Sequence, residues 1–356
     1  MEKTPFLSII MPMYNAENYI EDAIKSIQNQ KFEDFELIIV NDKSTDNSKE
    51  ICEQIKEKDA RIKIITVEKN GGAGNARNIG IQLAIGTYIT FMDADDIIDF
   101  DLYYNAYQKI VQYDVDEVVW GMTEEYYDQN GQCYLLNKLN LPETICVDSK
   151  QVRDMVIILE EKTLFGYQCN RFYRADIIKK NNIKFEKVIL YEDYFFNLEV
   201  IKHVKSMAVI EDVGYHYMKR PNDSITTRYV PEYFDLSKRR IGSLYQLYCF
   251  WNQDSTKVRN ILGERYLRYI LAGLMKSYDK KSKLVLKQRK QWLINVTEEK
   301  LYLDIVENCK TNQTALRMFL FMLQKKWWLG ALLLGWGVWV IKEKLPIVFN
   351  KIRIYK

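Results

Sequence analysis

Three aspartates stand within four residues in the stretch ITFMDADDII, which covers residues 89–98. They are Asp93, Asp95 and Asp96, and they follow an apolar run of the kind that forms a buried strand. Carboxylates this close together repel one another unless a cation lies between them. The pair Asp93 and Asp95 therefore indicates a site for a hard divalent ion, Mg²⁺ or Mn²⁺, with positions left open for phosphate oxygens. The same short pattern also occurs by chance as a solvated loop, so it needs support from the rest of the chain.

Two segments carry groups suited to a nucleotide. In VNDKSTDNS, Asp42 ends an apolar run, where its carboxylate can accept from a base N–H or a ribose hydroxyl; turn and helix-cap roles explain the polar residues after it equally well. In NGGAGNARNIG, the glycines allow close approach of a ligand to the backbone, and Arg77 can face a phosphate or a nucleobase. Arg77 stands where a dinucleotide-binding loop needs its third glycine, which argues against a nicotinamide dehydrogenase.

Acidic and basic groups recur later in the chain. The stretch LYEDYFFNLEV places Glu192 and Asp193 ahead of an apolar pattern with helical spacing, and the helix dipole alone favours acidic residues there. The stretch GYHYMKRPNDSITTR contains His216 and Arg220. A single histidine among tyrosines is more often a packed, hydrogen-bonded residue than a metal ligand. Neither stretch identifies a site by itself.

The elements that must hold these groups alternate over the first hundred residues. Apolar runs typical of strands are separated by stretches of helical spacing. The predicted strands cover 6–14, 35–42, 61–68 and 87–93, and the predicted helices cover 18–30, 47–58 and 72–85. This order indicates βαβ units and a parallel sheet with helices on both faces. Ligands bind at the carboxyl ends of strands in such sheets, so the polar groups are expected to meet there.

The remainder is less regular, and the composition excludes several classes of protein. A hairpin turned at Asn130 and Gly131 is expected within DEVVWGMTEEYYDQNGQCYLL, and the chain becomes largely helical after about residue 230. The net charge is +3, from 51 basic and 48 acidic residues, so nucleic acid is not expected as the main partner. Six scattered cysteines and two histidines argue against a zinc site and for a reducing compartment. The start, MEKTPFLSII, has no signal-peptide pattern.

The tail suggests a membrane surface. Residues 327–341, WWLGALLLGWGVWVI, carry no charge and lie between lysines, but fifteen helical residues reach only about 22 Å, against roughly 30 Å of hydrocarbon. Tryptophans suit a membrane interface, and residues 276–290 hold seven basic residues and one acidic residue, which would attract anionic lipid. We expect a peripheral position at the cytoplasmic face of the cell membrane, with residues 327–341 lying in the interface or dipping into it as a short hairpin or tilted C-terminal anchor. The alternatives are a buried C-terminal helix or a contact between subunits.

Taken in order, seven segments resemble the family 2 glycosyltransferases of GT-A type. They lie between about residues 8 and 227, nearly two thirds of the chain. The segments are SIIMPMYN, FELIIVNDKSTDNS, EKNGGAGNARNIGI, GTYITFMDADD, NRFYRADIIKKNNIKF, YED and YHYMKRPNDSIT. The resemblance implies an α/β fold, a Rossmann-like α/β/α sandwich that binds a nucleotide sugar. It implies a catalytic domain over 1–229, divided at residue 100 into nucleotide-sugar and acceptor halves. Beyond about residue 230 the resemblance implies little, and the residues themselves predict a mainly helical C-terminal extension, with a helical region at 230–314 and a membrane-associating tail at 315–356.

The resemblance also implies roles for individual residues. Donor-binding roles fall on Pro12, Tyr14, Asp42, Asn70, Arg77 and Asp93, with Asp42 on the base. Asp93 and Asp95 would hold Mn²⁺ or Mg²⁺, Asp193 would be the general base, and Glu192 its neighbour. His216, as a further metal ligand, or the loop that carries Arg220 and Ser224 would close over the diphosphate. Arg171 stands where a lysine is expected, and no role is assigned to it.

The implied reaction is an inverting transfer of a sugar, UDP-linked by family resemblance, to a hydroxyl acceptor. Loss of the diphosphate needs a cation, and attack by the acceptor needs a carboxylate on the opposite side of the anomeric carbon. A cell-surface polysaccharide or a lipid-linked oligosaccharide fits as acceptor. Two alternatives stay open: a sugar transferase acting on a polyprenyl phosphate, and a nucleotide-sugar-binding protein without turnover.

Overall fold

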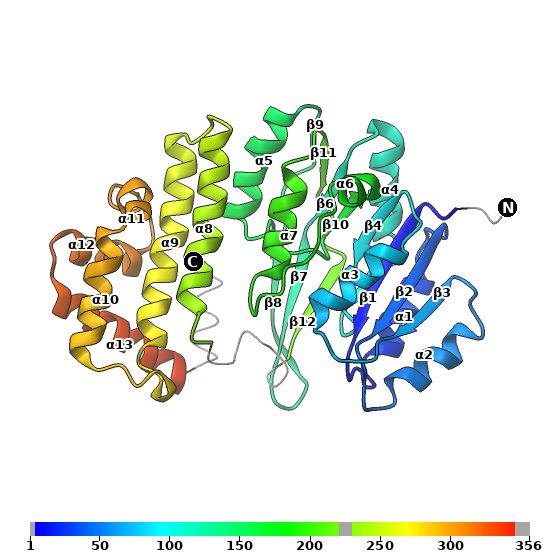
Figure 1. The fold of residues 1–356 in the computed structure, drawn as a ribbon, viewed down its shortest axis with the longest axis horizontal. Coiled ribbons are helices and arrows are strands. Elements are labelled where there is room, and N and C mark those ends of the chain that lie inside the picture. The colour runs from blue at the N-terminus through cyan, green and yellow to red at the C-terminus, as the bar shows by residue number, and fades with distance from the viewer. Residues whose placement is uncertain (1–3, 221–229, 346–356) are drawn as a thin grey trace. The chain divides into compact units, whose positions relative to one another are not determined.

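The computed structural model describes residues 4–220 and 230–345, and the chain divides into two compact units, Met1–Asp223 and Ser224–Lys356 (Figure 1). The first unit contains two sheets. The second unit is helical in its described residues. The predicted change to a largely helical chain after about residue 230 is therefore confirmed.

Four parallel strands form one end of the main sheet, in the order β3, β2, β1, β4. Every residue of β1, β2 and β4 is buried, which is why these strands read as unbroken apolar runs in the sequence. The strands are β1 (Leu7–Met13), β2 (Phe35–Asn41), β3 (Ile62–Thr66) and β4 (Tyr88–Phe91). They match the four predicted strands, and the parallel arrangement is confirmed.

Three helices connect these strands, as predicted. The helices are α1 (Ile20–Gln28), α2 (Ser48–Lys56) and α3 (Ala73–Leu83). On α1 the four apolar positions Ile20, Ala23, Ile24 and Ile27 are all buried, which follows from their three- and four-residue spacing. Helix α3 packs closely on β1, since a side chain at Gly80 would come within 2.3 Å of Ile10.

The main sheet continues beyond β4 with strands that sequence spacing did not separate. The full order is β3-β2-β1-β4-β10-β6-β11-β9, with β10 antiparallel to both of its neighbours. The added strands are β6 (Glu117–Trp120), β9 (Thr144–Cys146), β10 (Arg171–Arg174) and β11 (Met207–Ile210), with helices α4 (Leu102–Tyr113), α5 (Ser149–Glu161), α6 (Ala175–Lys180) and α7 (Glu192–Ile201) between or beside them. Helix α7 is the element that carries the predicted general base.

A second sheet of four strands lies in the same unit, in the order β5-β12-β7-β8. Its strands are β5 (Ile97–Ile98), β7 (Met122–Tyr127), β8 (Cys133–Leu139) and β12 (Tyr215–Lys219). The hairpin predicted around Asn130 and Gly131 is present as β7 and β8, but it begins later than predicted because β6 belongs to the main sheet. The break falls at Gly121, where a Cβ would lie 2.3 Å from the Leu139 carbonyl oxygen.

Arg171, to which the sequence assigned no role, forms a buried ion pair in the main sheet. Its Nη1 lies 2.8 Å from Glu117 Oε1, across the β10–β6 pairing. Its Nη2 donates to the carbonyl oxygens of Leu164 and Phe165. Pairing and hydrogen bonding together offset the cost of removing both charges from water. Arg171 therefore supports the sheet and the loop that precedes it.

The second unit is built around the long helix α9. Helix α9 (Thr256–Lys276) packs against α8, α10, α11, α12 and α13. The others are α8 (Tyr233–Phe250), a 3₁₀ turn η2 (Lys280–Ser282), α10 (Leu286–Glu298), α11 (Lys300–Ile305), α12 (Thr314–Gln324) and α13 (Trp328–Lys344). The predicted apolar tail is α13. Within residues 4–220 and 230–345, no helix has the length and apolar content needed to cross a membrane.

Candidate active site

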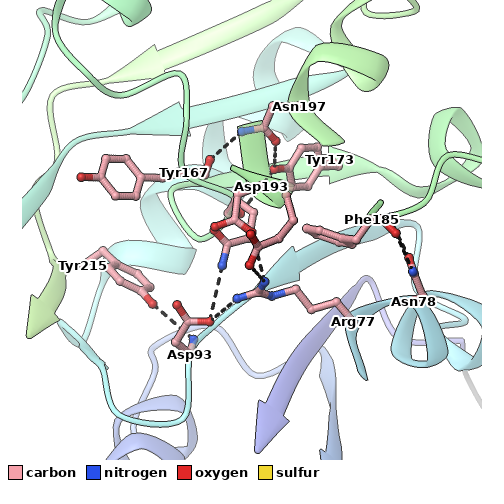
Figure 2. A network of polar contacts seen from close by, with 11 residues as sticks. Arg77, Asn78, Asp93, Tyr167, Tyr173, Phe185, Asp193, Asn197 and Tyr215 are labelled. Carbon is pink, nitrogen blue, oxygen red and sulfur yellow. Dashed lines mark hydrogen bonds and ion pairs between the residues drawn. The ribbon is translucent and has the colours of Figure 1, made fainter. Parts of the chain in front are cut away.

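Arg77 on α3 lies at the centre of a cluster of carboxylates (Figure 2). Its Nη2 is 2.7 Å from Asp93 Oδ1, and its Nη1 is 3.0 Å from Asp193 Oδ1. Glu192 is farther away, at 3.9 Å from Nη1. The planar guanidinium thus bridges the aspartate that follows β4 and the aspartate in the first turn of α7. Two motifs far apart in the sequence meet at one cation.

The segment before α7 is fixed against α3 by paired contacts. The Asn78 side chain donates to the Phe185 carbonyl oxygen at 2.9 Å and accepts from the Phe185 N–H at 2.8 Å. The Phe185 ring lies 5.3 Å from the Arg77 guanidinium, within the range of a cation–π contact. Tyr191 then adopts a left-handed conformation, with φ of 68°, immediately before α7 begins. These contacts set where the first turn of α7 stands relative to Arg77.

Asp193, the predicted general base, is largely enclosed by protein within this cluster. Its side chain keeps 28% of its surface exposed to the site and is otherwise enclosed by protein. Burial raises the pKa of Asp193 to about 8; the Arg77 charge opposes the increase, and the charges of Glu192 and Asp93 add to it. A carboxyl group with a pKa near the working pH is suited to proton transfer. The same carboxylates raise the pKa of Arg77 against the effect of its burial, so Arg77 stays charged.

The three aspartates of the predicted metal stretch point to different partners. Asp93 Oδ1 accepts from Arg77 and, at 3.4 Å, from Gln168 Nε2. The Asp95 side chain is 44% exposed and lies 3.5 Å from Arg220 Nη1, which also donates to the Asp95 carbonyl oxygen at 3.0 Å. The Asp96 side chain is buried and accepts hydrogen bonds from Tyr215 and Met218. Their mutual repulsion is therefore reduced by separation and by two arginines.

Asp96, for which the sequence suggested no role, connects this loop to β12. Its Oδ2 accepts from the Tyr215 hydroxyl at 2.7 Å, and its Oδ1 accepts from the Met218 N–H at 3.0 Å. The Tyr215 hydroxyl oxygen also accepts from the Asp93 N–H at 3.3 Å, a contact drawn in Figure 2. Burial and the neighbouring aspartates raise the pKa of Asp96 well above its usual range. Asp96 thus helps to hold the strand that leads to Arg220.

A pocket of about 450 Å³ opens beside Asp95 and Arg220. Arg220 stacks on the Tyr19 ring, with its guanidinium carbon 3.9 Å from the ring centroid. Asp99 and Phe100 line the pocket near β5. Arg220 and Asp95 therefore both line the pocket, where the Arg220 guanidinium can meet an anionic group that enters.

Three of the residues expected to hold the nucleotide, Pro12, Tyr14 and Asp42, lie at the carboxyl ends of β1 and β2, and Asn70 follows β3. Pro12 is buried in β1, and Tyr14 follows it on the surface. Asp42 is buried, and its two carboxylate oxygens accept from the N–H groups of Gly71 and Gly72 at 2.9 and 2.7 Å. The Asn70 side chain donates to the Asp42 carbonyl oxygen at 3.0 Å.

These contacts give Asp42 and Asn70 a structural role that the sequence did not suggest. They fix the glycine-rich loop ahead of α3, where Gly72 adopts a φ of 84° that favours glycine. Each carboxylate oxygen has two lone pairs, so an additional contact from Asp42 to a base remains chemically open. The nucleobase role of Asp42 stays a prediction.

His216 is on β12, and its ring lies between two carboxylates that come from other segments. Its Nδ1 is 2.6 Å from Glu125 Oε1, and its Nε2 is 3.1 Å from Asp99 Oδ1. Both ring nitrogens are therefore engaged by protein groups, and a metal-binding role for His216 stays a prediction. Ser224, expected in the same loop as Arg220, lies outside the described residues.

Several polar residues that support the site were missed by the sequence analysis. The Tyr173 hydroxyl donates to Asn197 Oδ1 at 2.6 Å, and Asn197 Nδ2 donates to the carbonyl oxygens of Phe165 and Tyr167. Gln168 reaches Asp93 from the same loop. These bonds attach α7 to the loop before β10. The available signal was Asn197 itself, a single amide within the apolar stretch YFFNLEV.

The donor atoms at this site fit a cation that arrives with a phosphate ligand. Among the residues that the structure describes, no group of three or more acidic, histidine or cysteine side chains is arranged to hold a metal ion. Mg²⁺ is commonly held by one or two carboxylates, with substrate phosphates and water completing its shell. Asp95 offers a half-exposed carboxylate beside the pocket, and Asp93 is close to it in the chain but bound to Arg77. The residues therefore fit an open site rather than a preformed metal cage.

Comparison with known proteins gives consistent matches. The family described as Glycosyl transferase family 2 matches residues 8–181. An uncharacterised glycosyltransferase of Haemophilus influenzae is 35% identical over 204 residues, covering 56% of this chain and 74% of that protein. The uncharacterised glycosyltransferase EpsJ of Bacillus subtilis is 32% identical, covering 64% of this chain and 65% of EpsJ. The match to a poly(ribitol-phosphate) beta-glucosyltransferase of Bacillus spizizenii, at 30% identity, spans 34% of that protein's length.

The solved structures show the fold. The crystal structure of S. aureus TarS 1–349 in complex with UDP-GlcNAc has a TM-score of 0.63 and 22% sequence identity, covering 92% of this chain and 90% of that chain. At this identity the likeness concerns the fold alone. The predicted α/β architecture with a helical C-terminal region is confirmed.

Proposed function

The chain belongs to the family 2 glycosyltransferases, and we propose that it transfers a sugar from a nucleotide-diphosphate sugar to an acceptor hydroxyl with inversion of configuration. The observation that carries the proposal is the ion pairing of Arg77 with both Asp93 and Asp193. Arg77 thereby links Asp93, at the strand end where the donor diphosphate is expected, with Asp193, whose carboxylate is suited to accept a proton. A single displacement needs both groups within reach of one anomeric carbon.

The donor is assigned to the edge of the main sheet within residues 1–100. Tyr14 and Asp42 would contact the nucleoside there, next to Pro12 and Asn70. Arg77 would hold Asp93 toward the donor. A UDP-linked sugar is the proposed donor, and TarS structures with UDP-GlcNAc and with UDP support it by analogy of fold.

In the chemical step, different residues would act on the acceptor hydroxyl and on the leaving diphosphate. Asp193 would take the proton of the acceptor hydroxyl as its oxygen attacks the anomeric carbon, and Glu192 would help to keep the pKa of Asp193 high. Arg220 would exchange its contact with Asp95 for the diphosphate oxygens. A Mg²⁺ or Mn²⁺ ion held by Asp95, with Asp93 and the predicted ligand His216 as further candidates, would neutralise charge on the leaving diphosphate.

The acceptor is proposed to be a cell-surface polysaccharide or a lipid-linked saccharide. Relatives of this chain include poly(ribitol-phosphate) glycosyltransferases of Bacillus spizizenii and Staphylococcus aureus, which supports this class. We assign the acceptor half to residues 101–229, which contain α7 and the strands β7, β8 and β12 of the second sheet. A peripheral position at the inner face of the cell membrane would bring the enzyme to such an acceptor.

The experiment is a thermal-shift panel of nucleotide sugars with and without Mn²⁺. A ligand that binds only the folded state adds RT ln(1 + L/Kd), where L is the free ligand concentration, to the free energy of unfolding, and so raises the unfolding temperature. One donor is expected to stabilise the protein, and to do so more strongly with Mn²⁺. Equal stabilisation by all nucleotides, or none by any sugar nucleotide, would contradict a specific donor site.

A second assay separates catalysis from binding without turnover. Release of nucleoside diphosphate from the stabilising donor alone indicates a competent active site. Acceptor profiling with saccharides and with polyprenyl phosphate then distinguishes the two enzyme classes. Donor binding with no release under any acceptor would support a binding protein instead.

A further inference from the structure

Helix α13 is apolar on two sides, and only one of them is covered within its own unit. The buried side includes Ala331, Leu332 and Gly335. The other side carries Leu329, Leu333 and Trp336, whose exposed fractions are 59%, 58% and 50%. Residues spaced by four and three lie along one line of a helix. We call Leu329, Leu333 and Trp336 the exposed stripe.

The covered side is packed too closely for α13 to turn its stripe inward. A Cβ at Gly335 would come within 2.6 Å of the Leu274 side chain on α9. The Leu332 carbonyl oxygen accepts from the Tyr278 hydroxyl at 2.8 Å, and the Tyr278 ring also meets Trp339. These contacts fix the rotation of the helix about its axis. The exposed stripe is therefore a lasting feature of the surface.

Basic residues surround the stripe at both ends of α13. Lys325 and Lys326 are exposed just before the helix, and Lys344 is exposed in its last turn, with Glu343 as the acidic exception. The Tyr278 contacts also bring the lysine-rich segment after α9 against α13. Its exposed basic residues are Lys280, Lys281, Lys283, Lys287 and Lys290.

We propose that the exposed stripe of α13 is a docking surface for an anionic lipid bilayer, on which the helix lies flat. Large apolar side chains with flanking lysines match the acyl boundary and the negatively charged headgroups of such a surface. Tryptophan is enriched at this depth, and Trp327 and Trp336 are both half-exposed. A second copy of this chain fits less well, because pairing two stripes would bring lysines against lysines.

The helix lies on the bilayer rather than crossing it. Its 17 residues reach about 25 Å, less than the roughly 30 Å of a hydrocarbon core. Its other side packs against α9, α10 and α12, so lipid cannot surround it. This inference deepens the membrane location that we propose for the enzyme, and it does not depend on the catalytic assignment.

Vesicle flotation of the full chain tests the proposal. Wild-type protein is expected to float with vesicles of phosphatidylcholine and phosphatidylglycerol, to float poorly with phosphatidylcholine alone, and to release at high salt. Leu333→Glu is expected to weaken flotation roughly tenfold or more, since a charge replaces a buried apolar contact. Phe250→Ser is the matched control, because Phe250 is 82% exposed on α8, outside the stripe.

A second variant and two further readouts keep the outcomes distinct. Lys325→Gln with Lys326→Gln is expected to reduce flotation on anionic vesicles and to leave the unfolding temperature unchanged. Donor binding by Leu333→Glu is expected to equal that of wild type, so a failed donor site and a failed docking surface give different results. Unchanged flotation of Leu333→Glu, or no flotation of wild type, overturns the proposal. A third result would also overturn it: wild type does not bind vesicles but forms a dimer in solution, and Leu333→Glu dissociates that dimer.

Discussion

Arg77 Nη1 lies 3.0 Å from Asp193 Oδ1, although the two residues are 116 positions apart in the chain. The same guanidinium holds Asp93 through its other terminal nitrogen. A single buried cation thus sets the distance between the aspartate of the predicted metal pair and the predicted base. The arrangement explains how a carboxylate cluster can exist before any ligand binds.

Replacement of Arg77 should separate the two aspartates. Arg77→Lys keeps one charge but lacks the two terminal guanidinium nitrogens that contact Asp93 and Asp193 separately, so transfer is expected to fall while the fold survives. Arg77→Ala leaves carboxylates without their cation and is expected to cost roughly 3–5 kcal/mol of unfolding free energy. Steady-state kinetics and denaturant unfolding measure the two effects. Wild-type activity in Arg77→Lys would show that the bridge is not needed.

The pH dependence of transfer reports on Asp193. A general base acts when deprotonated, and the pKa of Asp193 is raised to about 8, so kcat/KM is expected to increase with pH up to about 8. Asp193→Asn should lower transfer by about 10²–10⁴-fold and abolish that increase. A pH profile that stays unchanged in Asp193→Asn would assign the titration to another group.

The same variant has a separate signature in stability. A carboxyl group whose pKa is raised by folding stabilises the protein at pH values below its unfolded pKa of about 4, and this contribution is lost as pH rises through about 8. Asp193→Asn carries no such charge. It is therefore expected to unfold at a temperature equal to or above that of wild type at pH 9, which thermal unfolding followed by circular dichroism can measure. A lower temperature would mean that Asp193 supports the fold.

Removal of the Asp95 carboxylate should affect metal dependence alone. Asp95→Ala is expected to abolish metal-dependent turnover with little change in unfolding temperature, because its side chain is half-exposed. Asp101→Ala is the matched control: Asp101 is an exposed aspartate before α4 whose side chain makes no cap hydrogen bond. Titration of Mn²⁺ against initial rate separates the two. Full activity of Asp95→Ala in excess chelator would contradict a metal site at Asp95.

Asp96 should matter for stability through its two buried acceptor oxygens. Asp96→Ala leaves the Tyr215 hydroxyl and the Met218 N–H without this partner, which costs about 1–3 kcal/mol per unsatisfied group. Asp96→Asn keeps the size and an acceptor oxygen, so it is expected to lie much closer to wild type. Thermal unfolding compares the pair. Equal losses in both variants would mean that the charge, and not the hydrogen bonding, is required.

The parallel half of the fold could be predicted from sequence because its signals are local. Strands β1, β2 and β4 are buried on both faces and therefore read as apolar runs, and α1 shows its buried face through spacing alone. The separation of β6 from β7 was not predictable in the same way. It depends on Gly121 lying against the Leu139 carbonyl oxygen, a contact between distant segments.

The site shows the same division. The sequence identified Asp93, Asp95 and Asp193 as groups capable of chemistry. For Arg77 it predicted a contact with a phosphate or a nucleobase, and it did not predict ion pairs with two carboxylates. Long-range pairing leaves no trace in local spacing. Arg171 was missed for a similar reason, since its partner Glu117 lies on another strand of the sheet.

A crystal structure of the enzyme with a nucleotide sugar and Mn²⁺ tests the central assignment most directly. The diphosphate is expected beside Asp95 and Arg220, with the anomeric carbon of the sugar facing Asp193. Nucleotide sugar bound away from Asp95, or a sugar whose anomeric carbon lies out of reach of an acceptor held by Asp193, would contradict the account.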